Sequence, residues 1–415
     1  MGKDWQGVSR RNAMRENAGL GQGCQHAFQI RREQALCRDV SRYHSTLSLR
    51  HTLLIPTRWF GTYPELPTYT LDGKDLQDVL NDNAKELIGN NVINKFGHTK
   101  LPYLPKVLSI AKALPLQLHP NKSLAAKLHK KDPSNFTDPN HKPEIALALT
   151  KFEAFCGFKP IETIAKLLKL EPLKKFLPDV SKPTFDDQTL KHVVKAMLTA
   201  DEKVIGSTVE AIYKLDKSSF GDETYIPDLI PRLAEQYDKT DPGLVVALIT
   251  MNYLVLQPGE GIYIPADGIH AYLAGDIIEC MARSNNVLNT GFCPAAERNS
   301  AELFTSCLTF TPHSAEECML RPQSYSGSKE GKTTTYKPPM SEFDMLVVDL
   351  KKGDKETLAA VDGPSVAIAT KGSATLRAKG EEYKVGEGNI FFIGQGTEVE
   401  LKSGSGLQMH VAYVE

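Results

Sequence analysis

Two polar side chains on an apolar segment give the first indication of chemistry in this chain. Residues 114–119 read Leu-Pro-Leu-Gln-Leu-His, so Gln117 and His119 lie two positions apart. Residues i and i+2 of a β-strand point to the same face, which would let the Gln117 amide oxygen and the His119 imidazole converge on one point. A buried polar pair needs a partner, and a metal ion is one candidate. The alternative is a solvated or internally hydrogen-bonded pair on a half-exposed strand.

Two later segments favour the metal ion. Residues 141–144 read His-Lys-Pro-Glu and precede an apolar run, which places the carboxylate of Glu144 at the start of a predicted buried strand. Residues 258–272 predict a strand, a tight turn and a second strand that carries His270. Two imidazoles, one carboxylate and one amide oxygen suit a first-row divalent cation, and zinc above the others.

The rest of the chain must supply the elements that position these residues. Apolar residues recur at helical spacing within residues 71–100, and a short helix is predicted for 122–130. Residues 160–250 predict four amphipathic helices separated by prolines. Short strands with glycine turns dominate residues 253–292 and 343–415. Two strand blocks separated by helices indicate two jelly rolls with a helical insertion.

Composition narrows the class of protein. The chain has 415 residues, of which 41% are hydrophobic and 24% are charged, as is typical of a soluble globular protein. The net charge of -1 provides no overall field that favours nucleic acid or membrane, so neither is expected as a partner. The seven cysteines form no C-x-x-C pair, which favours reduced thiols in a cytoplasmic protein.

The chain also resembles a known family, the type I phosphomannose isomerases, which are zinc-dependent mannose-6-phosphate isomerases of the cupin superfamily. The resemblance covers roughly residues 59–415, and both the order and the spacing of the matching segments fit. The segments that carry it are 101–114, 117–122, 140–144, 268–275 and 279–284.

The resemblance implies a fold and an activity. The implied fold is mainly β with an α-helical insertion and two cupin-type jelly-roll β-sandwich domains. The implied reaction interconverts mannose 6-phosphate and fructose 6-phosphate, which feeds GDP-mannose synthesis and protein glycosylation. The implied partner is a small-molecule sugar phosphate, and the expected assembly is a monomer.

The resemblance also implies roles for individual residues. The family's ligands for one Zn²⁺ per chain map onto Gln117, His119, Glu144 and His270. Positions that line the family's active site map onto Lys106, Lys142, Tyr272 and Glu279. Glu279 is the candidate that moves a proton between C1 and C2 of the sugar, and its alternative role is to support a metal ligand. Tyr272 could hydrogen-bond the sugar, and the two lysines could contact phosphate or sugar oxygens.

These patterns predict four parts of the chain. Residues 1–55 form an atypical Arg-rich segment, expected to be poorly ordered, that lacks the family's first strand motif, and Thr57 stands where the family has Glu. An alternative exon or a faulty gene model would explain this segment. Residues 160–251 are the helical insertion, expected to form a wall or lid of the pocket. The catalytic zinc-binding jelly roll is assigned to 56–159 and 252–325, and the C-terminal jelly roll to 326–415.

The chain departs from the family pattern near the site. Asn289 and Ala295 stand where the family has Arg and Lys, Asn285 replaces an Asp, and Pro115 replaces a small hydroxyl residue. An Arg, a Lys and a hydroxyl are groups expected to hold a phosphate or a developing oxyanion. Arg298 could replace the lost arginine, although an exposed surface arginine is the simpler interpretation.

Three functional hypotheses therefore remain from the sequence. The leading one is a zinc-dependent isomerase whose activity is reduced by these departures. The second is a zinc-binding paralogue that binds sugar phosphates as a regulatory protein with little or no isomerase activity. The third is a cupin enzyme that acts on a different sugar. His410, near the C-terminus, is expected to be packed or solvated rather than to bind the metal.

Overall fold

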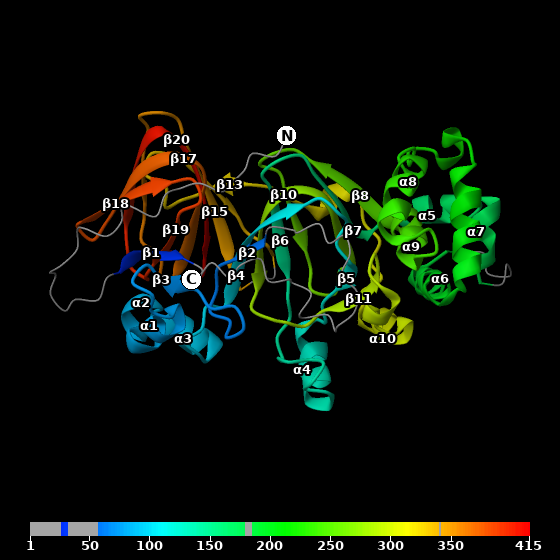
Figure 1. Ribbon diagram of the computed structural model, residues 1–415, viewed down its shortest axis with the longest axis horizontal. Helices are drawn as coiled ribbons and strands as arrows, with labels where there is room; N and C mark the ends of the chain where they lie inside the picture. The colour runs from blue at the N-terminus through cyan, green and yellow to red at the C-terminus, as the bar shows by residue number, and fades with distance from the viewer. Residues whose placement is uncertain (1–25, 32–56, 179–184, 340–341) are drawn as a thin grey trace.

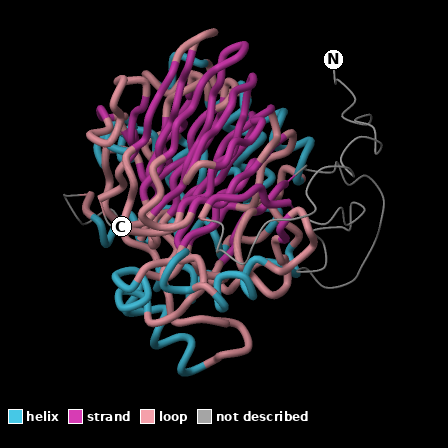
Figure 2. The backbone as a smooth tube through the Cα atoms, turned by 90° about the vertical axis from the view of Figure 1, so that its left-hand side faces the viewer, coloured by secondary structure: helices cyan, strands magenta, loops and turns pink. Residues whose placement is uncertain are grey.

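Two ten-stranded antiparallel sheets form most of the molecule, with a helical block at one end (Figure 1). The computed structural model describes residues 26–31, 57–178, 185–339 and 342–415, and every structural statement below refers to these residues. The prediction of a mainly β protein with an α-helical insertion and two jelly rolls is confirmed. A view from the side shows the strands gathered in the middle of the molecule, with helices at the edges (Figure 2).

The first jelly roll is built around one long strand, β10. The first part of β10 pairs with β5 and β7, and its second part pairs with β4 and β6. The register shifts between Tyr272 and Ala274, as expected where a strand passes from one sheet of a sandwich to the other. The strands of this jelly roll are β2 (Thr57–Trp59), β4 (Tyr103–Ile110), β5 (Leu116–Leu118), β6 (Glu144–Ala148), β7 (Phe152–Phe158), β8 (Met251–Leu256), β9 (Gly261–Ile264), β10 (His270–Ala282), β11 (Leu288–Gly291) and β12 (Met319–Leu320).

The second jelly roll is built around the two long strands β17 and β20, which pair with each other. The sequence predicts shorter strands here, because glycines such as Gly372 indicate turns. In the structure a Cβ added at Gly372 would lie 2.1 Å from the Gly406 carbonyl oxygen, so these glycines let two strands approach closely. The strands are β1 (Ala27–Arg31), β3 (Tyr69–Thr70), β13 (Gln323–Ser324), β14 (Thr333–Tyr336), β15 (Asp344–Leu350), β16 (Lys355–Leu358), β17 (Ser365–Ala378), β18 (Glu381–Gly386), β19 (Ile390–Ile393) and β20 (Val399–Tyr413).

The N-terminal segment corrects one expectation. Residues 1–55 were expected to be poorly ordered, yet residues 27–31 form the strand β1, which pairs with β19 and β3. Phe28 and Ile30 of this strand are buried in an apolar core. Burial of these side chains explains why the strand forms within an otherwise polar, Arg-rich stretch. The expectation for residues 1–25 and 32–55 lies outside the described residues.

The helices that follow β3 belong to both jelly rolls rather than to the first alone, as the predicted boundary at residue 56 had assigned them. Leu87 of α2 accepts a backbone hydrogen bond from Gln395, and Lys95 of α3 donates to the Glu415 carbonyl. These contacts place the helices beneath the second jelly roll (Figure 1). The helices outside the insertion are α1 (Leu76–Asp82), α2 (Ala84–Leu87), α3 (Asn90–Phe96), α4 (Lys122–Lys131), α10 (Ala301–Cys307), η4 (Ala295–Glu297) and η5 (Ala315–Cys318).

The helical insertion packs against β5, β7 and β11 of the first jelly roll through one large apolar core. Four amphipathic helices were expected, and the structure adds α9, every residue of which is buried. A helix that is apolar on all sides has no amphipathic period, so its pattern gave no helical signal. The elements are α5 (Ile161–Leu167), η2 (Glu171–Phe176), α6 (Asp187–Thr199), α7 (Glu202–Tyr213), η3 (Lys217–Phe220), α8 (Ile226–Tyr237) and α9 (Pro242–Thr250).

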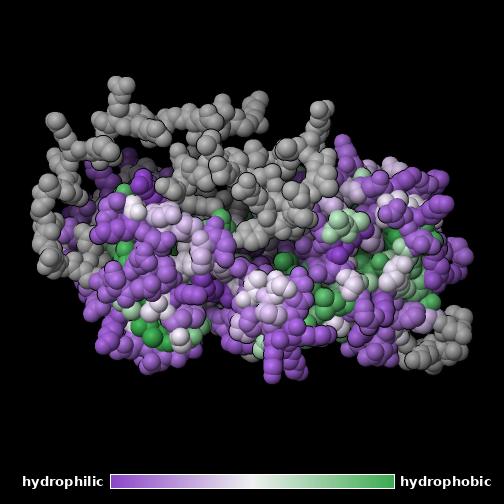
Figure 3. Space-filling model, turned by 60° about the horizontal axis from the view of Figure 1, so that its bottom comes forward, coloured by the Kyte–Doolittle hydropathy of each residue, from purple (hydrophilic) through white to green (hydrophobic). Residues whose placement is uncertain are grey.

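The two jelly rolls share one apolar core. Ile145 and Ile278 of the first jelly roll pack in the same buried cluster as Val366 and Phe392 of the second. Hydrophilic residues dominate the described part of the face in Figure 3, and apolar side chains are visible there only as separate small groups. Among the described residues, no helix combines the length and apolar character that a membrane crossing requires.

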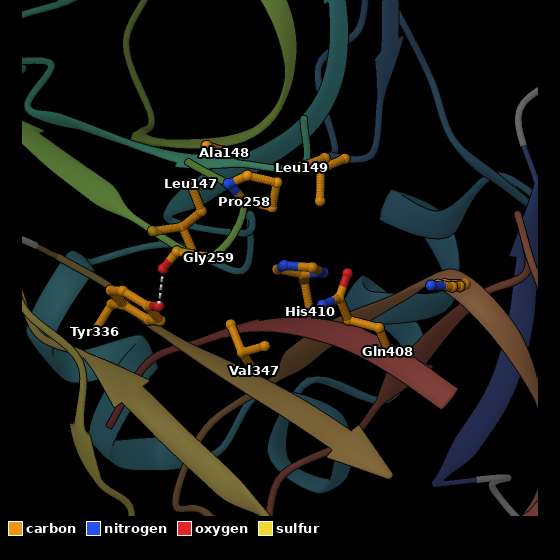
Figure 4. A pocket seen from close by; sticks show the side chains of 10 residues that line it. Leu147, Ala148, Leu149, Pro258, Gly259, Tyr336, Val347, Gln408 and His410 are labelled. Atoms are coloured by element: carbon orange, nitrogen blue, oxygen red, sulfur yellow. Dashed lines mark hydrogen bonds between the residues drawn. The ribbon is translucent and has the colours of Figure 1, made fainter. Parts of the chain in front are cut away.

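A cavity of about 280 Å³ lies between the two jelly rolls (Figure 4). His410 of β20 is 4% exposed and its Nδ1 lies 3.1 Å from the Thr370 hydroxyl, so this histidine is packed, as expected. Burial lowers the pKa of His410 to about 4. The residues that line the cavity are Leu147, Ala148, Leu149, Pro258, Gly259, Tyr336, Val347, Lys371, Gln408 and His410.

Candidate metal centre

Three side chains from three segments converge inside the first jelly roll. His119 follows β5, Glu144 is the first residue of β6, and His270 is the first residue of β10. One ligand atom from each lies within 4.8 Å of the others, and all three residues are at most 2% exposed. Within the described ranges this is the one group of histidine, cysteine or acidic residues that could hold a metal ion.

The hydrogen bonds of the two histidines fix which ring nitrogen faces the centre. His119 Nδ1 lies 2.7 Å from the Asn286 carbonyl oxygen, and His270 Nδ1 lies 3.0 Å from the Gly268 carbonyl oxygen. A carbonyl only accepts, so each Nδ1 carries a proton, and in the neutral ring each Nε2 presents a lone pair. Burial, aided by Lys142, lowers the pKa of His119 to about 4, which keeps this ring neutral near pH 7.

These lone pairs face a carboxylate rather than a donor. His119 Nε2 lies 3.2 Å from Glu144 Oε1, and His270 Nε2 lies 3.5 Å from Glu144 Oε2. Both Nε2 atoms are buried without a hydrogen-bond partner. Three acceptors that point at one another in a buried site are costly unless a cation lies between them. The donor set therefore fits a divalent metal ion.

The register of the sheet brings the fourth sequence candidate to the same face. Gln117 lies directly opposite His270 in the pairing of β5 with β10. Directly opposed residues of antiparallel strands point to the same face, and His119 lies two positions beyond Gln117. The expected convergence of Gln117 with the two histidines is thus compatible with the backbone.

Two neighbours keep Glu144 ionised and oriented. Lys142 Nζ lies 3.4 Å from Glu144 Oε1, and the Tyr272 hydroxyl donates to Glu144 Oε2 at 3.3 Å. Burial opposes ionisation of Glu144, but the Lys142 ammonium favours it, and the pKa of Glu144 lies well below the ordinary value. Burial also lowers the pKa of Lys142, against the attraction of Glu144. The loop lysine is therefore a part of the centre and not a solvated side chain.

Tyr272 lies against Glu144 in the interior. The tyrosine is 1% exposed and its hydroxyl donates to Glu144, and its expected hydrogen bond to a sugar stays a prediction. Burial raises the pKa of Tyr272 well above the ordinary value, so the phenol stays protonated and can only donate or accept as a neutral group. Through this hydrogen bond Tyr272 orients the Glu144 carboxylate.

Lys106 and Glu279 form a second charged pair in the same interior. They lie directly opposite each other on β4 and β10 and form a buried ion pair. Lys106 Nζ also lies 3.2 Å from the Met281 sulfur and 4.7 Å from the centre of the Trp59 ring. Burial raises the pKa of Glu279, and Lys106 limits that rise. A carboxyl group whose pKa is raised toward neutrality can both take up and release a proton.

The residues that depart from the family pattern occupy different environments. Asn289 is buried on β11, directly opposite Gln117. Ala295 is exposed in η4. Arg298 neither lies free on the surface nor reaches toward the metal ligands, because its guanidinium bonds Asp241 at 2.9 Å and the Cys293 carbonyl. Arg298 therefore ties the start of α9 to the segment after β11.

Two features of the centre were not predicted from the sequence. The Asn286 carbonyl fixes the His119 ring, and backbone acceptors leave no residue-type signal. Trp59 lies over the ammonium of Lys106, and its place in the chain before β4 gave no hint of this contact. The contact of Trp59 with Lys106 arises because β2 pairs with β4, which places the two residues opposite each other.

Comparisons with known proteins agree with this geometry. The family model for the phosphomannose isomerase type I catalytic domain matches residues 44–161, and that for the type I C-terminal domain matches residues 335–381. The mannose-6-phosphate isomerase of Candida albicans is 35% identical over 408 residues, which cover 90% of this chain and 91% of that protein.

Solved structures show the same fold. A crystal structure of a point mutant of phosphomannose isomerase from Salmonella typhimurium matches with a TM-score of 0.74 at 25% identity, over 86% of this chain and 90% of that chain. A crystal structure of zinc-bound mannose 6-phosphate isomerase matches with a TM-score of 0.73 at 24% identity, over 86% of this chain and 91% of that chain. The expected pair of cupin-type jelly rolls is thereby confirmed.

Proposed function

Because the chain belongs to the type I phosphomannose isomerases, we propose that it is a metal-dependent mannose-6-phosphate isomerase, which interconverts mannose 6-phosphate and fructose 6-phosphate. The observation that carries this proposal within the molecule is the convergence of two unprotonated Nε2 atoms on an ionised carboxylate. An aldose–ketose isomerase needs an electrophile beside the sugar carbonyl, and a metal bound there would meet that need.

The metal is proposed to be one Zn²⁺ per chain, held by four residues. Imidazole nitrogen and carboxylate oxygen are ordinary zinc ligands, and the same set appears in no other described part of the chain. The amide oxygen of Gln117 completes the set from the neighbouring strand. Zinc in this position would supply Lewis-acid polarisation of the substrate carbonyl. The proposed ligands are Gln117, His119, Glu144 and His270.

Glu279 is the residue proposed to carry the proton between C1 and C2. Its raised pKa shortens the gap to the working pH, which favours proton transfer in both directions. Lys106 holds the carboxylate in place through the buried ion pair and favours its ionised form. Lys142 is proposed to contact substrate oxygens from the loop before β6, since its side chain is 13% exposed beside Glu144.

The compartment is proposed from the state of the cysteines, and the oligomeric state is proposed from the exposed surface. We propose the cytoplasm, because the five described cysteines are free thiols. We propose a monomer, because the exposed large apolar side chains of the described surface are few and lie on separate elements. The reduced activity expected from Pro115, Asn289 and Ala295 stays a prediction.

The test of this function is turnover of mannose 6-phosphate by the zinc-loaded protein, with His270→Ala as the control. We expect zinc-dependent formation of fructose 6-phosphate by the wild type and its loss in the variant, in which one ligand is missing. Far-ultraviolet circular dichroism of both proteins checks that the variant is folded. A zinc-loaded wild type that forms no fructose 6-phosphate would contradict the proposal and support the sugar-phosphate-binding alternative.

A further inference from the structure

Three strands align three amide or imidazole side chains in one row across the first jelly roll. Gln117 of β5 lies opposite His270 of β10 on one side and opposite Asn289 of β11 on the other. Directly opposed residues of antiparallel strands share a face. Asn289 therefore lies on the face that carries the proposed metal ligands, one strand beyond Gln117.

The side chain of Asn289 is buried and makes no hydrogen bond within the described structure. The residue is 6% exposed, and its Oδ1 has no partner. The backbone of the same residue is fully used, since its N–H donates to Asn299 Oδ1 and its carbonyl accepts from Asn299 N–H, both at 2.8 Å. A buried amide oxygen without a donor reduces the stability of the fold. The backbone of Asn289 thus serves the fold, whereas its side chain does not.

No free basic side chain lies close to Asn289 in the sequence. Arg298 is the sole basic side chain between residues 284 and 300, and its guanidinium is bonded to Asp241 and to the Cys293 carbonyl. A neutral amide cannot balance a phosphate dianion, but it can donate to and accept from a hydroxyl at the same time. The chemistry of this position therefore matches a sugar hydroxyl and not a phosphate.

We propose that Asn289 is a specificity residue that hydrogen-bonds a hydroxyl group of the sugar at the metal centre. This inference rests on the proposed function, because it takes the ligand to be a sugar phosphate. The unpaired Oδ1 is the acceptor that the bound hydroxyl satisfies. The phosphate of the same ligand lies away from β11, toward residues other than Asn289.

The test compares Asn289→Ala with Asn252→Ala, a matched buried asparagine. Asn252 is 4% exposed, and its amide donates to the Phe158 and His313 carbonyls, both at 3.1 Å. The ligand is sorbitol 6-phosphate, which lacks a carbonyl and cannot isomerise, and its binding to the zinc-loaded proteins is measured by titration calorimetry. We expect Asn289→Ala to weaken this binding about tenfold, as the loss of one buried hydrogen bond does. Asn252→Ala should bind as the wild type does.

Thermal unfolding separates the substrate contact from a structural role. Asn289→Ala should leave the melting temperature unchanged or raise it, because the variant removes an unsatisfied buried group. Asn252→Ala should lower the melting temperature, because the His313 carbonyl loses this donor and the Phe158 carbonyl keeps only the His313 N–H. The inference is overturned if Asn289→Ala melts earlier than the wild type, or if it binds sorbitol 6-phosphate with wild-type affinity.

Inorganic phosphate distinguishes the hydroxyl from the phosphate end of the ligand. We expect Asn289→Ala and the wild type to bind phosphate equally, and a weaker phosphate affinity of the variant would overturn the assignment to a hydroxyl. Turnover of mannose 6-phosphate tests the proposed function separately from the role of Asn289. A wild type that binds sorbitol 6-phosphate but forms no fructose 6-phosphate contradicts the isomerase proposal, while the Asn289 comparison remains decisive.

Discussion

The two jelly rolls each bury a glutamate, and the two glutamates are satisfied in opposite ways. Glu356 of the second jelly roll is 0% exposed and is surrounded by donors. Its carboxylate accepts from the hydroxyls of Ser328 and Thr333 at 2.6 and 3.0 Å, and from the N–H groups of Lys332 and Glu330 at 2.7 and 3.1 Å. These bonds lower the pKa of Glu356 in spite of its burial.

Glu144 of the first jelly roll is 2% exposed but faces acceptors as well as donors. Lys142 and the His119 Nε2 lie beside its Oε1, while the Tyr272 hydroxyl and the His270 Nε2 lie beside its Oε2. A carboxylate with a full set of donors needs nothing further, whereas one that shares its space with lone pairs needs a cation. The difference shows that the kind of neighbour, rather than burial or charge, distinguishes a site from a structural residue.

The variant with the largest expected effect is Glu144→Gln. We expect the variant to lose zinc and at least about 10³-fold in kcat/KM, because the metal and its contribution to the barrier are lost together. Zinc at 100 to 1,000 times its Kd should raise the free energy of unfolding of the wild type by about 3–4 kcal/mol and that of the variant not at all. Calorimetric unfolding with and without zinc measures this stabilisation for the wild type and for the variant. A zinc-dependent shift of wild-type size in Glu144→Gln would contradict the assignment.

The matched change in the second jelly roll is Glu356→Gln. We expect zinc-dependent turnover to stay within about twofold of the wild type, because the residue lies in the other sheet system. The free energy of unfolding should fall by about 2–3 kcal/mol, since charge-assisted bonds from several donors are weakened or lost. Urea unfolding of the zinc-loaded proteins measures this difference. Loss of turnover without loss of stability would contradict the structural role assigned to Glu356.

Glu342 offers a smaller effect with a defined pH dependence. Its carboxylate bonds Lys122 at 2.8 Å and Asn140 at 3.0 Å and lies 3.3 Å from His141. Burial opposes ionisation, but these partners outweigh it and lower the pKa of Glu342 to about 2. A lowered folded-state pKa gives stability that is present above the ordinary value of 4.5 and is lost as the pH falls toward 2.

The corresponding variant is Glu342→Gln. We expect its free energy of unfolding to be about 1–2 kcal/mol below that of the wild type at pH 7, after allowance for solvent screening of a partly exposed group. The difference should shrink steadily between pH 4.5 and pH 3. Urea unfolding at four pH values measures it. A difference that stays constant or grows as the pH falls would show that the ionised carboxylate is not the stabilising form.

Local sequence patterns predicted the parts of the site that depend on one element. The two-residue spacing of Gln117 and His119 predicted a shared strand face, and the run after Glu144 predicted the buried strand β6, which the structure contains. His270 begins β10 after the expected turn. The glycine-rich strand blocks and the helical insertion were likewise correct, because amphipathic and alternating patterns arise from burial on one face.

The rest depends on contacts that no local pattern encodes. The hydrogen bond from Tyr272 to Glu144 depends on the pairing of β10 with β7 in its first part and with β6 in its second part. The row that joins Asn289 to Gln117 needs the register of β11 as well. The helix α9 was missed because burial on all sides removes its period. The strand β1 was missed because the partner that stabilises it is far away in the sequence.

That distant partner sets a limit on when the protein can finish folding. Ala27 pairs with Ile393, so an early segment of the chain joins a sheet most of whose strands come late in the sequence. During synthesis from the N-terminus, the apolar side chains of Phe28 and Ile30 must wait for nearly the whole chain to leave the ribosome. Contacts of such long range slow folding and leave apolar surface open in the meantime. The apolar face of β1 therefore stays without its partner strand until the C-terminal part of the chain has been synthesised.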